Sequence, residues 1–287
     1  MSDEANDTSS PPPQLVLKAF GITGTGKVRS SNEDQFLIAE LSKGMHVWQT
    51  SLTEPRLQVG EERAHLMLVA DGMGGHRAGE RASAIAVVAI EQFTLNTFRW
   101  FFDTDGRGAR KVLAEFQSAL SQADAKIFEE AAENPELKGM GTTLTMAFQL
   151  GAQLCIVHVG DSRAYLYRGG RLHQLTKDHT LIAEMISSGR ITEDQAASHH
   201  LRHVITNAVG GPKIGVKVEA RALVIQAGDR VLLCSDGLTE MLQSDAIMAV
   251  LEAEPRPEKA AKALLRQAND AGGRDNITVL IARFDPP

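Results

Sequence analysis

The stretch LMLVADGMGGH, from Leu66 to His76, places an aspartate and several glycines directly after an apolar run. Such a run, bounded by glycine, predicts a buried strand with Asp71 at its end. The design recurs three times, once with the aspartate at the head of the strand: CIVHVG-Asp161-Ser162, VLLCS-Asp236-Gly237 and GGR-Asp275-Asn276-Ile277. A carboxylate at a strand end is rigidly placed yet reaches solvent, and an adjacent glycine lets backbone or ligand approach closely.

These aspartates, together with Asn32-Glu33-Asp34, indicate a metal site. One Asp-Gly pair alone would indicate a turn, but a turn aspartate has no reason to follow a buried-looking strand each time. Converging carboxylates repel one another, and cations normally hold them together. Ligands that offer only oxygen select Mg²⁺ or Mn²⁺ over zinc. His199, His200 and His203 have few carboxylates near them in the sequence, which disfavours a metal role for these histidines.

Another stretch, GITGTGKV from Gly21 to Val28, comes within one residue of a nucleotide-binding P-loop. Val28 stands where a P-loop needs the Ser or Thr hydroxyl that holds Mg²⁺. A P-loop must also open a helix, and the following VRSSNEDQFLIAE lacks a helical apolar period. We therefore interpret the stretch as a turn that delivers Arg29 and the acidic pair Glu33-Asp34.

The composition is that of an ordinary globular protein, with 43% hydrophobic and 23% charged residues in a chain of 287. The net charge of −6 argues against a nucleic-acid partner, because phosphate neutralisation needs a basic surface. Residues 1–14 are polar, acidic and proline-rich, which predicts a disordered N-terminal tail rather than a signal peptide. No apolar stretch is long enough for a membrane span. Cys155 and Cys234 lie in strand-like runs and indicate free thiols, so we expect a cytoplasmic protein.

The order of the predicted elements favours a layered α+β fold. Short runs of branched residues predict many strands. Amphipathic patterns predict helices in two adjacent pairs, at Gly79–Phe98 and Gly108–Glu133 and near Asp245–Glu252 and Pro257–Ala271. Strands in runs beside paired helices do not alternate as in a doubly wound sheet, so antiparallel sheets are favoured. No linker follows the tail, and we expect one domain over residues 15–287.

The sequence resembles the bacterial members of the metal-dependent protein phosphatase (PPM) family, the type 2C Ser/Thr phosphatases. The resemblance covers Phe20 to Phe284 and rests on ordered motifs: RSSNED, VADGMGGHRAGE, GMGTTLTM, HVGDSRAYLY, LTKDHTLI, ITNAVGG, CSDGLTE and GRDNITVLIARF. It implies two antiparallel β-sheets sandwiched between pairs of antiparallel helices, a four-layer αββα arrangement. It also implies a centre of two Mg²⁺ or Mn²⁺ ions in a cleft at one edge of the sandwich.

The resemblance also implies a role for each metal-site residue. Asp71 would bridge the two ions, and the carbonyl of Gly72 would bind the second. Asp236 and Asp275 would complete the first ion, and Glu33 would belong to the second. A hydroxide shared by the ions would then attack the phosphorus directly.

Further residues are expected around this centre. Asp34 would hold a metal-bound water, and Asn276 would lie beside the ligands. Asp161 resembles the ligand of a third, weaker metal of bacterial members. Arg29 matches the arginine that grips the substrate phosphate through a bidentate fork.

Some positions depart from the family pattern or leave alternatives open. Met73 stands where several animal members carry a histidine proposed as general acid. His76, three residues later, could donate the proton or could cap the following helix. Residues 41–65 are longer than the hairpin typical of bacterial relatives, and either an extended hairpin or a partner-docking arm would account for them. Residues 178–211 correspond to the family's flap beside the cleft.

The resemblance implies a Mg²⁺/Mn²⁺-dependent protein Ser/Thr phosphatase. Its expected partners are phosphorylated proteins, as substrates of bacterial Ser/Thr kinases, and we expect a monomer. Two alternatives remain open: a phosphatase-like regulatory binding module without turnover, and a phosphatase dedicated to one small regulatory protein.

Overall fold

The computed structural model describes residues 15–42, 63–75, 77–97, 108–197, 199–211 and 214–287. The predicted tail, residues 43–62 of the long 41–65 segment, and His76 therefore lie outside the described residues. The interpretation of the 41–65 segment as a hairpin or a docking arm concerns these residues and stays a prediction.

The described strands form two antiparallel sheets. The first sheet follows the order β1 (Val16–Gly24), β12 (Ile277–Asp285), β11 (Arg230–Cys234), β7 (Arg163–Arg168) and β8 (Arg171–Gln174). The second sheet follows the order β10 (Glu219–Val224), β6 (Gln153–Val159), β5 (Leu144–Leu150), β3 (Arg63–Met73), β4 (Gly141–Thr142) and β9 (Val209–Gly210), and β2 (Asp34–Ser42) also pairs with β3.

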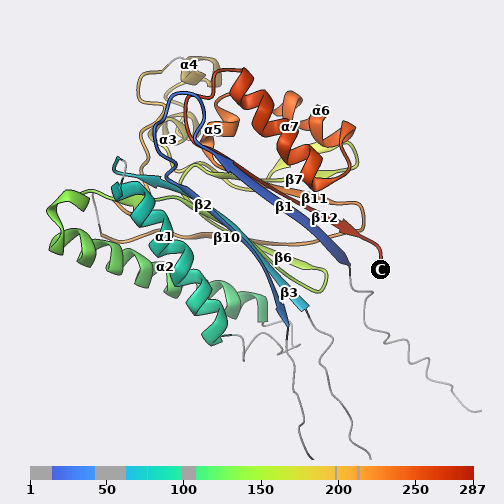
Figure 1. The fold of residues 1–287 in the computed structure, drawn as a ribbon, viewed down its shortest axis with the longest axis horizontal. Helices are drawn as coiled ribbons and strands as arrows, with labels where there is room; N and C mark the ends of the chain where they lie inside the picture. The colour runs from blue at the N-terminus through green and yellow to red at the C-terminus, as the bar shows by residue number, and fades with distance from the viewer. Residues whose placement is uncertain (1–14, 43–62, 76, 98–107, 198, 212–213) are drawn as a thin grey trace, which may run out of the picture.

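Helix pairs cover the outer faces of both sheets (Figure 1). α1 (Arg77–Thr97) and α2 (Gly108–Glu133) lie on the second sheet, and α6 (Ser244–Ala253) and α7 (Pro257–Asp270) lie on the first. Three buried apolar clusters fill the interfaces between these four layers, one under each helix pair and one between the sheets. The predicted α+β sandwich of four layers is therefore confirmed.

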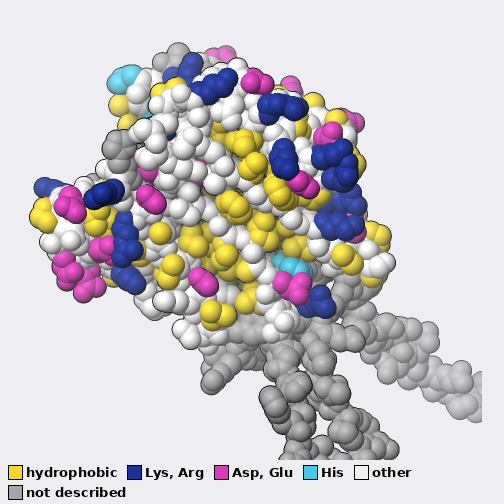
Figure 2. Space-filling model, in the orientation of Figure 1, with side chains coloured by type: hydrophobic (Ala, Val, Ile, Leu, Met, Phe, Trp, Pro, Cys, Tyr) yellow, Lys and Arg dark blue, Asp and Glu magenta, His cyan; other side chains and the backbone are white. Residues whose placement is uncertain are grey.

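The two sheets approach each other along one side of the sandwich. There the edge strand β1 of the first sheet lies beside β2 of the second. Figure 2 shows apolar side chains gathered over the middle of this face, and Lys and Arg side chains over the α6–α7 side. β1 and β2 are edge strands of the described sheets and do not pair with each other. Apolar contacts between their side chains join the two sheets here.

The predicted long helices have nearly the predicted bounds. α2 spans Gly108–Glu133 as expected, and α1 begins two residues earlier than the predicted Gly79. The sequence patterns missed the short elements β4, β8 and β9, together with α3 (Leu181–Ser187), α4 (Glu193–Ala197), α5 (Asp236–Thr239) and the 3₁₀ helix η2 (Pro135–Leu137). Elements of two to seven residues are too short to show a clear period.

The P-loop interpretation of residues 21–28 does not fit the structure. Gly21 to Gly24 belong to β1, and the described residues that follow form turns and then β2, without a helix. The strand therefore ends in a turn that leads to Arg29, as the sequence predicted.

The register of β2 and β3 separates the carboxylate end of the sandwich from the 43–62 connection. Asp34 pairs with Asp71 at one end of the hairpin, and Ser42 pairs with Arg63 at the other. The two pairs are eight residue steps apart along β2, which corresponds to about 27 Å. Ser42 and Arg63, the residues on either side of the 43–62 segment, thus lie at the end of the sheet away from the carboxylates.

Candidate active site

One cleft at the edge of the sandwich brings together the predicted site residues that the structure describes, with the exception of the buried Asp34. Its volume is about 430 Å³, and its lining includes Arg29, Glu33, Asp71, Gly72, Asp161, Asp236, Asp275 and Asn276. Asp71 lies near the end of β3 in the second sheet, and Asp161 lies in the turn between β6 of the second sheet and β7 of the first, whereas Asp236 and Asp275 flank the adjacent strands β11 and β12 of the first. The strand-end design therefore collects carboxylates from both sheets at one edge, as the sequence predicted.

The backbone around Asp71 is held by short hydrogen bonds. The Asp71 N–H donates to Thr143 Oγ1 at 3.1 Å, and the Asp71 carbonyl accepts from the Thr143 N–H and the Thr142 hydroxyl, each at 2.9 Å. The next residue must be glycine, because a Cβ on Gly72 would lie 2.2 Å from the Gly79 carbonyl oxygen. The end of β3 therefore packs directly on the first turns of α1.

Asp34 lies in a polar contact between the two sheets. Its side chain is buried on β2, and Oδ2 accepts hydrogen bonds from Ser235 Oγ at 2.8 Å and Thr278 Oγ1 at 2.6 Å in the first sheet. Burial is the main cause that raises the pKa of Asp34 to about 6, while the two hydroxyls act in the opposite direction. Asp34 Oδ1 has no described partner, so it remains a buried acceptor.

Asn276 also holds the two sheets together. Its Oδ1 accepts from the Glu33 N–H at 2.8 Å, and its Nδ2 donates to the carbonyls of Ser31 at 2.8 Å and Thr25 at 3.2 Å. The loop between β1 and β2 is therefore attached to the head of β12. This contact fixes the backbone of Glu33 relative to Asp275, the neighbour of Asn276.

Arg29 lies against the carboxylate cluster. Its Nη2 donates to Asp275 Oδ2 at 2.7 Å, and its side chain is 55% exposed. Asp275 raises the pKa of Arg29 through this hydrogen bond. An exposed guanidinium at the mouth of the cleft can exchange this partner for an incoming anion.

The carboxylates strongly influence one another's ionisation. Desolvation by the surrounding protein and the charges of neighbouring carboxylates raise the pKa values of Asp71 and Asp236 well above the usual range. Burial, followed by the charge of Asp178, raises the pKa of Asp161 to about 7. Asp161 Oδ1 is buried without a described partner, as is Asp34 Oδ1. Repelling carboxylates with unused buried oxygens fit hard divalent cations, which bind oxygen ligands.

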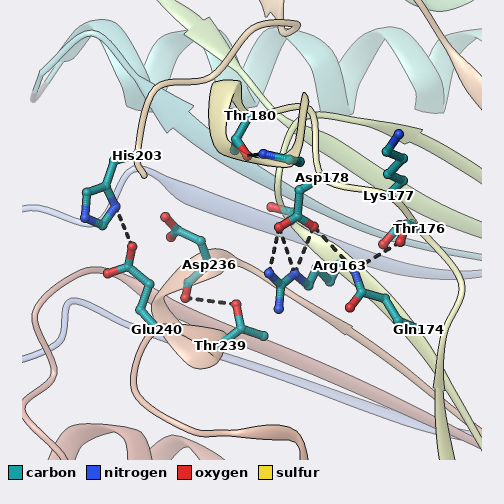
Figure 3. A network of polar contacts seen from close by, with 12 residues as sticks. Arg163, Gln174, Thr176, Lys177, Asp178, Thr180, His203, Asp236, Thr239 and Glu240 are labelled. Carbon is teal, nitrogen blue, oxygen red and sulfur yellow. Dashed lines mark hydrogen bonds and ion pairs between the residues drawn. The ribbon is translucent and has the colours of Figure 1, made fainter. Parts of the chain in front are cut away.

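A second polar network borders the cleft on the flap side (Figure 3). His203 Nδ1 lies 2.6 Å from Glu240 Oε1. One potential metal-ligand atom from each of His203, Asp236 and Glu240 lies within 4.8 Å of the other two. Arg163 donates from Nε and Nη2 to both carboxylate oxygens of Asp178. The sequence argument that His203 has few nearby carboxylates was therefore wrong, because Asp236 in α5 and Glu240, directly after α5, lie close to it in the folded protein.

The flap is joined across its own base and attached to the sandwich near its C-terminal end. Thr180 and Ile205 form an antiparallel bridge between the two sides of the flap. Beyond it, the buried Asp124 of α2 accepts the Gly210 N–H at Oδ1 (2.7 Å) and the Gly215 N–H at Oδ2 (2.9 Å). Gly210 lies in β9, which pairs with β4, and β4 pairs with Gly72 at the cleft. No sequence motif indicated Asp124, because its partners lie more than eighty residues away.

The two-sheet sandwich with a carboxylate-lined cleft at its edge has the arrangement expected from the resemblance to the type 2C phosphatases. Residues 53–271 match the profile of the family described as Protein phosphatase 2C, and the chain belongs to this family. It is 39% identical over 268 residues to the Serine/threonine protein phosphatase PstP of Mycobacterium tuberculosis. That match covers 93% of the chain but 45% of PstP, so the chain spans about half the length of this relative.

Other relatives match over nearly their whole length. The Serine/threonine phosphatase stp of Listeria monocytogenes is 32% identical over 265 residues, which cover 92% of the chain and 94% of stp. A crystal structure of the M. tuberculosis phosphatase PstP/Ppp superposes with a TM-score of 0.76 at 35% identity, covering 94% of this chain and all of that one. The PstP catalytic domain in complex with two manganese ions superposes with a TM-score of 0.72 at 33% identity, covering 94% and 99%.

Proposed function

We propose that this protein is a Mg²⁺- or Mn²⁺-dependent protein Ser/Thr phosphatase that hydrolyses phosphoserine and phosphothreonine. One observation carries the proposal: carboxylates from both sheets converge in a single cleft with Arg29 at its mouth. Membership of the protein phosphatase 2C family and the similarity to named Ser/Thr phosphatases support it. The manganese ions in the similar PstP structure support the metal requirement.

The cleft offers carboxylate and carbonyl oxygens as candidate ligands. Asp71, the Gly72 carbonyl and Glu33 would hold one ion, and Asp71 with Asp236 and Asp275 would hold the other. Asp161 is the candidate for a third, weaker site. Bound divalent ions lower the pKa of a coordinated water, which makes hydroxide available near neutral pH for attack on phosphorus.

The chain's own residues would bind and orient the substrate. Arg29, which donates to Asp275 in the structure, would turn its guanidinium to two phosphate oxygens and neutralise charge that develops on them. The buried Asp34 Oδ1 is an acceptor that can orient a water. Asn276 keeps Glu33 and Asp275 at a fixed spacing through its backbone contacts. The leaving alkoxide needs a proton, and His76 or a water could supply it.

The expected partners are phosphorylated proteins, in particular the substrates of bacterial Ser/Thr kinases. We further propose that the protein acts in the cytoplasm as a monomer, and that residues 15–287 form one domain in which 178–211 serve as a flap. Among the described helices, none has the length and apolar character needed to cross a bilayer.

Phosphopeptide hydrolysis tests the proposal directly. Release of phosphate from phosphoserine and phosphothreonine peptides should require Mn²⁺ or Mg²⁺ and stop in EDTA. Asp71→Asn should abolish it, and Lys27→Ala serves as the matched control because its side chain is exposed. Metal-independent turnover would refute the mechanism. Metal binding without any turnover would favour the regulatory binding module, and turnover confined to one protein substrate would favour a dedicated phosphatase.

A further inference from the structure

The cleft does not end at the carboxylates. A second cavity of about 640 Å³ lies between the flap and α5, and the two cavities share part of their lining. The shared residues are Asp161, Arg202, His203, Asp236, Glu240 and Arg274. A substrate chain that places its phosphate in the first cavity can therefore extend across this boundary into the second.

Each acidic residue at the boundary between the two cavities has a partner, either a neighbouring histidine or a proposed metal ion. Glu240 is paired with His203 at 2.6 Å, and Asp161 and Asp236 belong to the proposed metal site. Arg202 and Arg274 differ from them. Neither guanidinium makes an ion pair or a hydrogen bond with any of the described residues, and both side chains are exposed. Two cations at the boundary are thus available to an incoming anion.

The two arginines come from separate elements. Arg202 lies in the flap, and Arg274 lies in the turn between α7 and β12. This turn is firmly held, because Gly273 donates its N–H to the Ala268 carbonyl at 3.1 Å and accepts the Lys27 N–H at 2.7 Å. Arg274 directly precedes Asp275, so its backbone has a fixed position relative to the carboxylate cluster.

The flap side of the second cavity has an apolar wall with polar and acidic residues beside it. Ile182, Ala183 and Ile186 of α3 and Ala196 of α4 line it. Such a wall suits the side chains of an extended peptide. Asp178 and Glu193 also line the cavity, and Asp178 is paired with Arg163 at 2.6 Å. Among the described residues that line this cavity, Arg202 and Arg274 are the arginines without an acidic partner.

We propose that Arg202 and Arg274 form a subsite for a second anionic group of the substrate, either a carboxylate or a second phosphate within a few residues of the scissile phosphate. This inference rests on the proposed phosphatase function. Guanidinium groups bind carboxylate and phosphate through the same planar fork of donors, so both sources fit the geometry.

Peptide kinetics test the subsite. A neutral phosphothreonine peptide is compared with versions carrying one Glu, or one non-hydrolysable phosphonate residue, at each position from −3 to +3. At low ionic strength, the best anionic position should raise kcat/KM roughly two- to fivefold per engaged arginine, and high salt should reduce the gain. A larger gain for Glu identifies acidic peptides as the source, and a larger gain for the phosphonate identifies multiply phosphorylated ones.

Variants decide whether the arginines cause the preference. The ratio of anionic to neutral peptide should fall to about one in the Arg202→Gln/Arg274→Gln double variant. It should persist in Arg221→Gln, a matched exposed arginine on β10 that lines neither cavity. Each ratio compares two peptides on one preparation, so the folded fraction cancels.

The outcomes separate this inference from the function on which it rests. If the neutral peptide is not hydrolysed with Mn²⁺, the proposed function fails. If it is hydrolysed but no anionic position is preferred, or if the preference survives in the double variant, only the subsite is overturned.

Discussion

Replacing Asp161 with asparagine should stabilise the metal-free protein, and the gain should grow with pH. The Asp161 side chain is 8% exposed, and burial with the nearby charge of Asp178 raises its pKa from 3.8 to about 7. Because the folded-state pKa is the higher one, the folded protein loses stability as the pH rises from about 4 through 7. Above that range the penalty is constant. Asparagine does not ionise, so the variant avoids this penalty.

The size of the effect follows from the pKa shift. A rise of about 3 units corresponds to about 4 kcal/mol at pH 8.5, and the part already incurred at pH 5 is about 2 kcal/mol. The carboxamide N–H of the variant would be buried without a described partner, which destabilises the folded variant by about 1–2 kcal/mol and offsets part of the gain. Urea unfolding in EDTA should therefore show Asp161→Asn to be more stable than the parent by about 2–3 kcal/mol at pH 8.5. At pH 5 the two proteins should be nearly equal.

Asp229→Asn is the matched control for this experiment. Asp229 is also a buried aspartate, but it accepts from Arg168 Nε and Nη2 and from the Gln226 N–H. Removing its charge should destabilise the protein at both pH values, because a paired arginine loses its partner. If Asp161→Asn is likewise destabilising, or if its gain is the same at pH 5 and pH 8.5, the argument from carboxylate burial and repulsion is refuted.

Four other substitutions, with Lys27→Ala as a control, test the remaining assignments. Asp236→Asn should nearly abolish Mn²⁺-dependent turnover with an unchanged circular dichroism spectrum, and an unaltered kcat in saturating Mn²⁺ would contradict its role as a ligand. Arg29→Ala should lower kcat/KM by about 1.5–3 kcal/mol through lost phosphate contacts, whereas Lys27→Ala should change kcat/KM little. If His76 is the proton donor, His76→Ala should slow phosphopeptide hydrolysis by about 10²–10⁴-fold but p-nitrophenyl phosphate hydrolysis far less, and equal losses would remove it from the mechanism. Asp124→Asn should cost about 1–3 kcal/mol of stability in urea unfolding, because an NH2 group, which cannot accept, replaces one of the two oxygens that accept from the Gly210 and Gly215 N–H groups, and an unchanged midpoint would show that this attachment of the flap is dispensable.

The fold was predictable because its signals are local. Runs such as QLCIVHV and the long helical patterns show period and composition within a few residues, and β6 and α2 have the predicted bounds. The convergence of carboxylates was also predictable, since every one of them lies next to an apolar strand. A residue at the end of a buried strand must lie at an edge of the sheet, so the sequence pattern predicts where its carboxylate is located.

The flap side of the site could not be predicted in this way. His203 meets Glu240 across 37 residues of sequence, and the backbone of Gly210 meets Asp124 across 86. No strand or helix pattern places either residue beside its partner. The contacts depend on how the flap folds back over α5 and α2, which is a tertiary result. Only the packed structure could show that His203 has a carboxylate neighbour.

The site lies between two sheets that repel each other at that edge. Carboxylates from both sheets face one cleft, and their unfavourable charge would tend to open it in the absence of cations. Hydrogen bonds between the sheets oppose this: the hydroxyls of Ser235 and Thr278 donate to Asp34, and Asn276 accepts from the Glu33 N–H. These bonds cross between the sheets and need no metal, so they keep the ligands near their working positions before ions bind. Ion binding then raises the free energy of unfolding, and the increase grows with the logarithm of the ion concentration divided by the dissociation constant of the site. The same carboxylates that weaken the metal-free protein should therefore make it the more strongly stabilised by Mn²⁺.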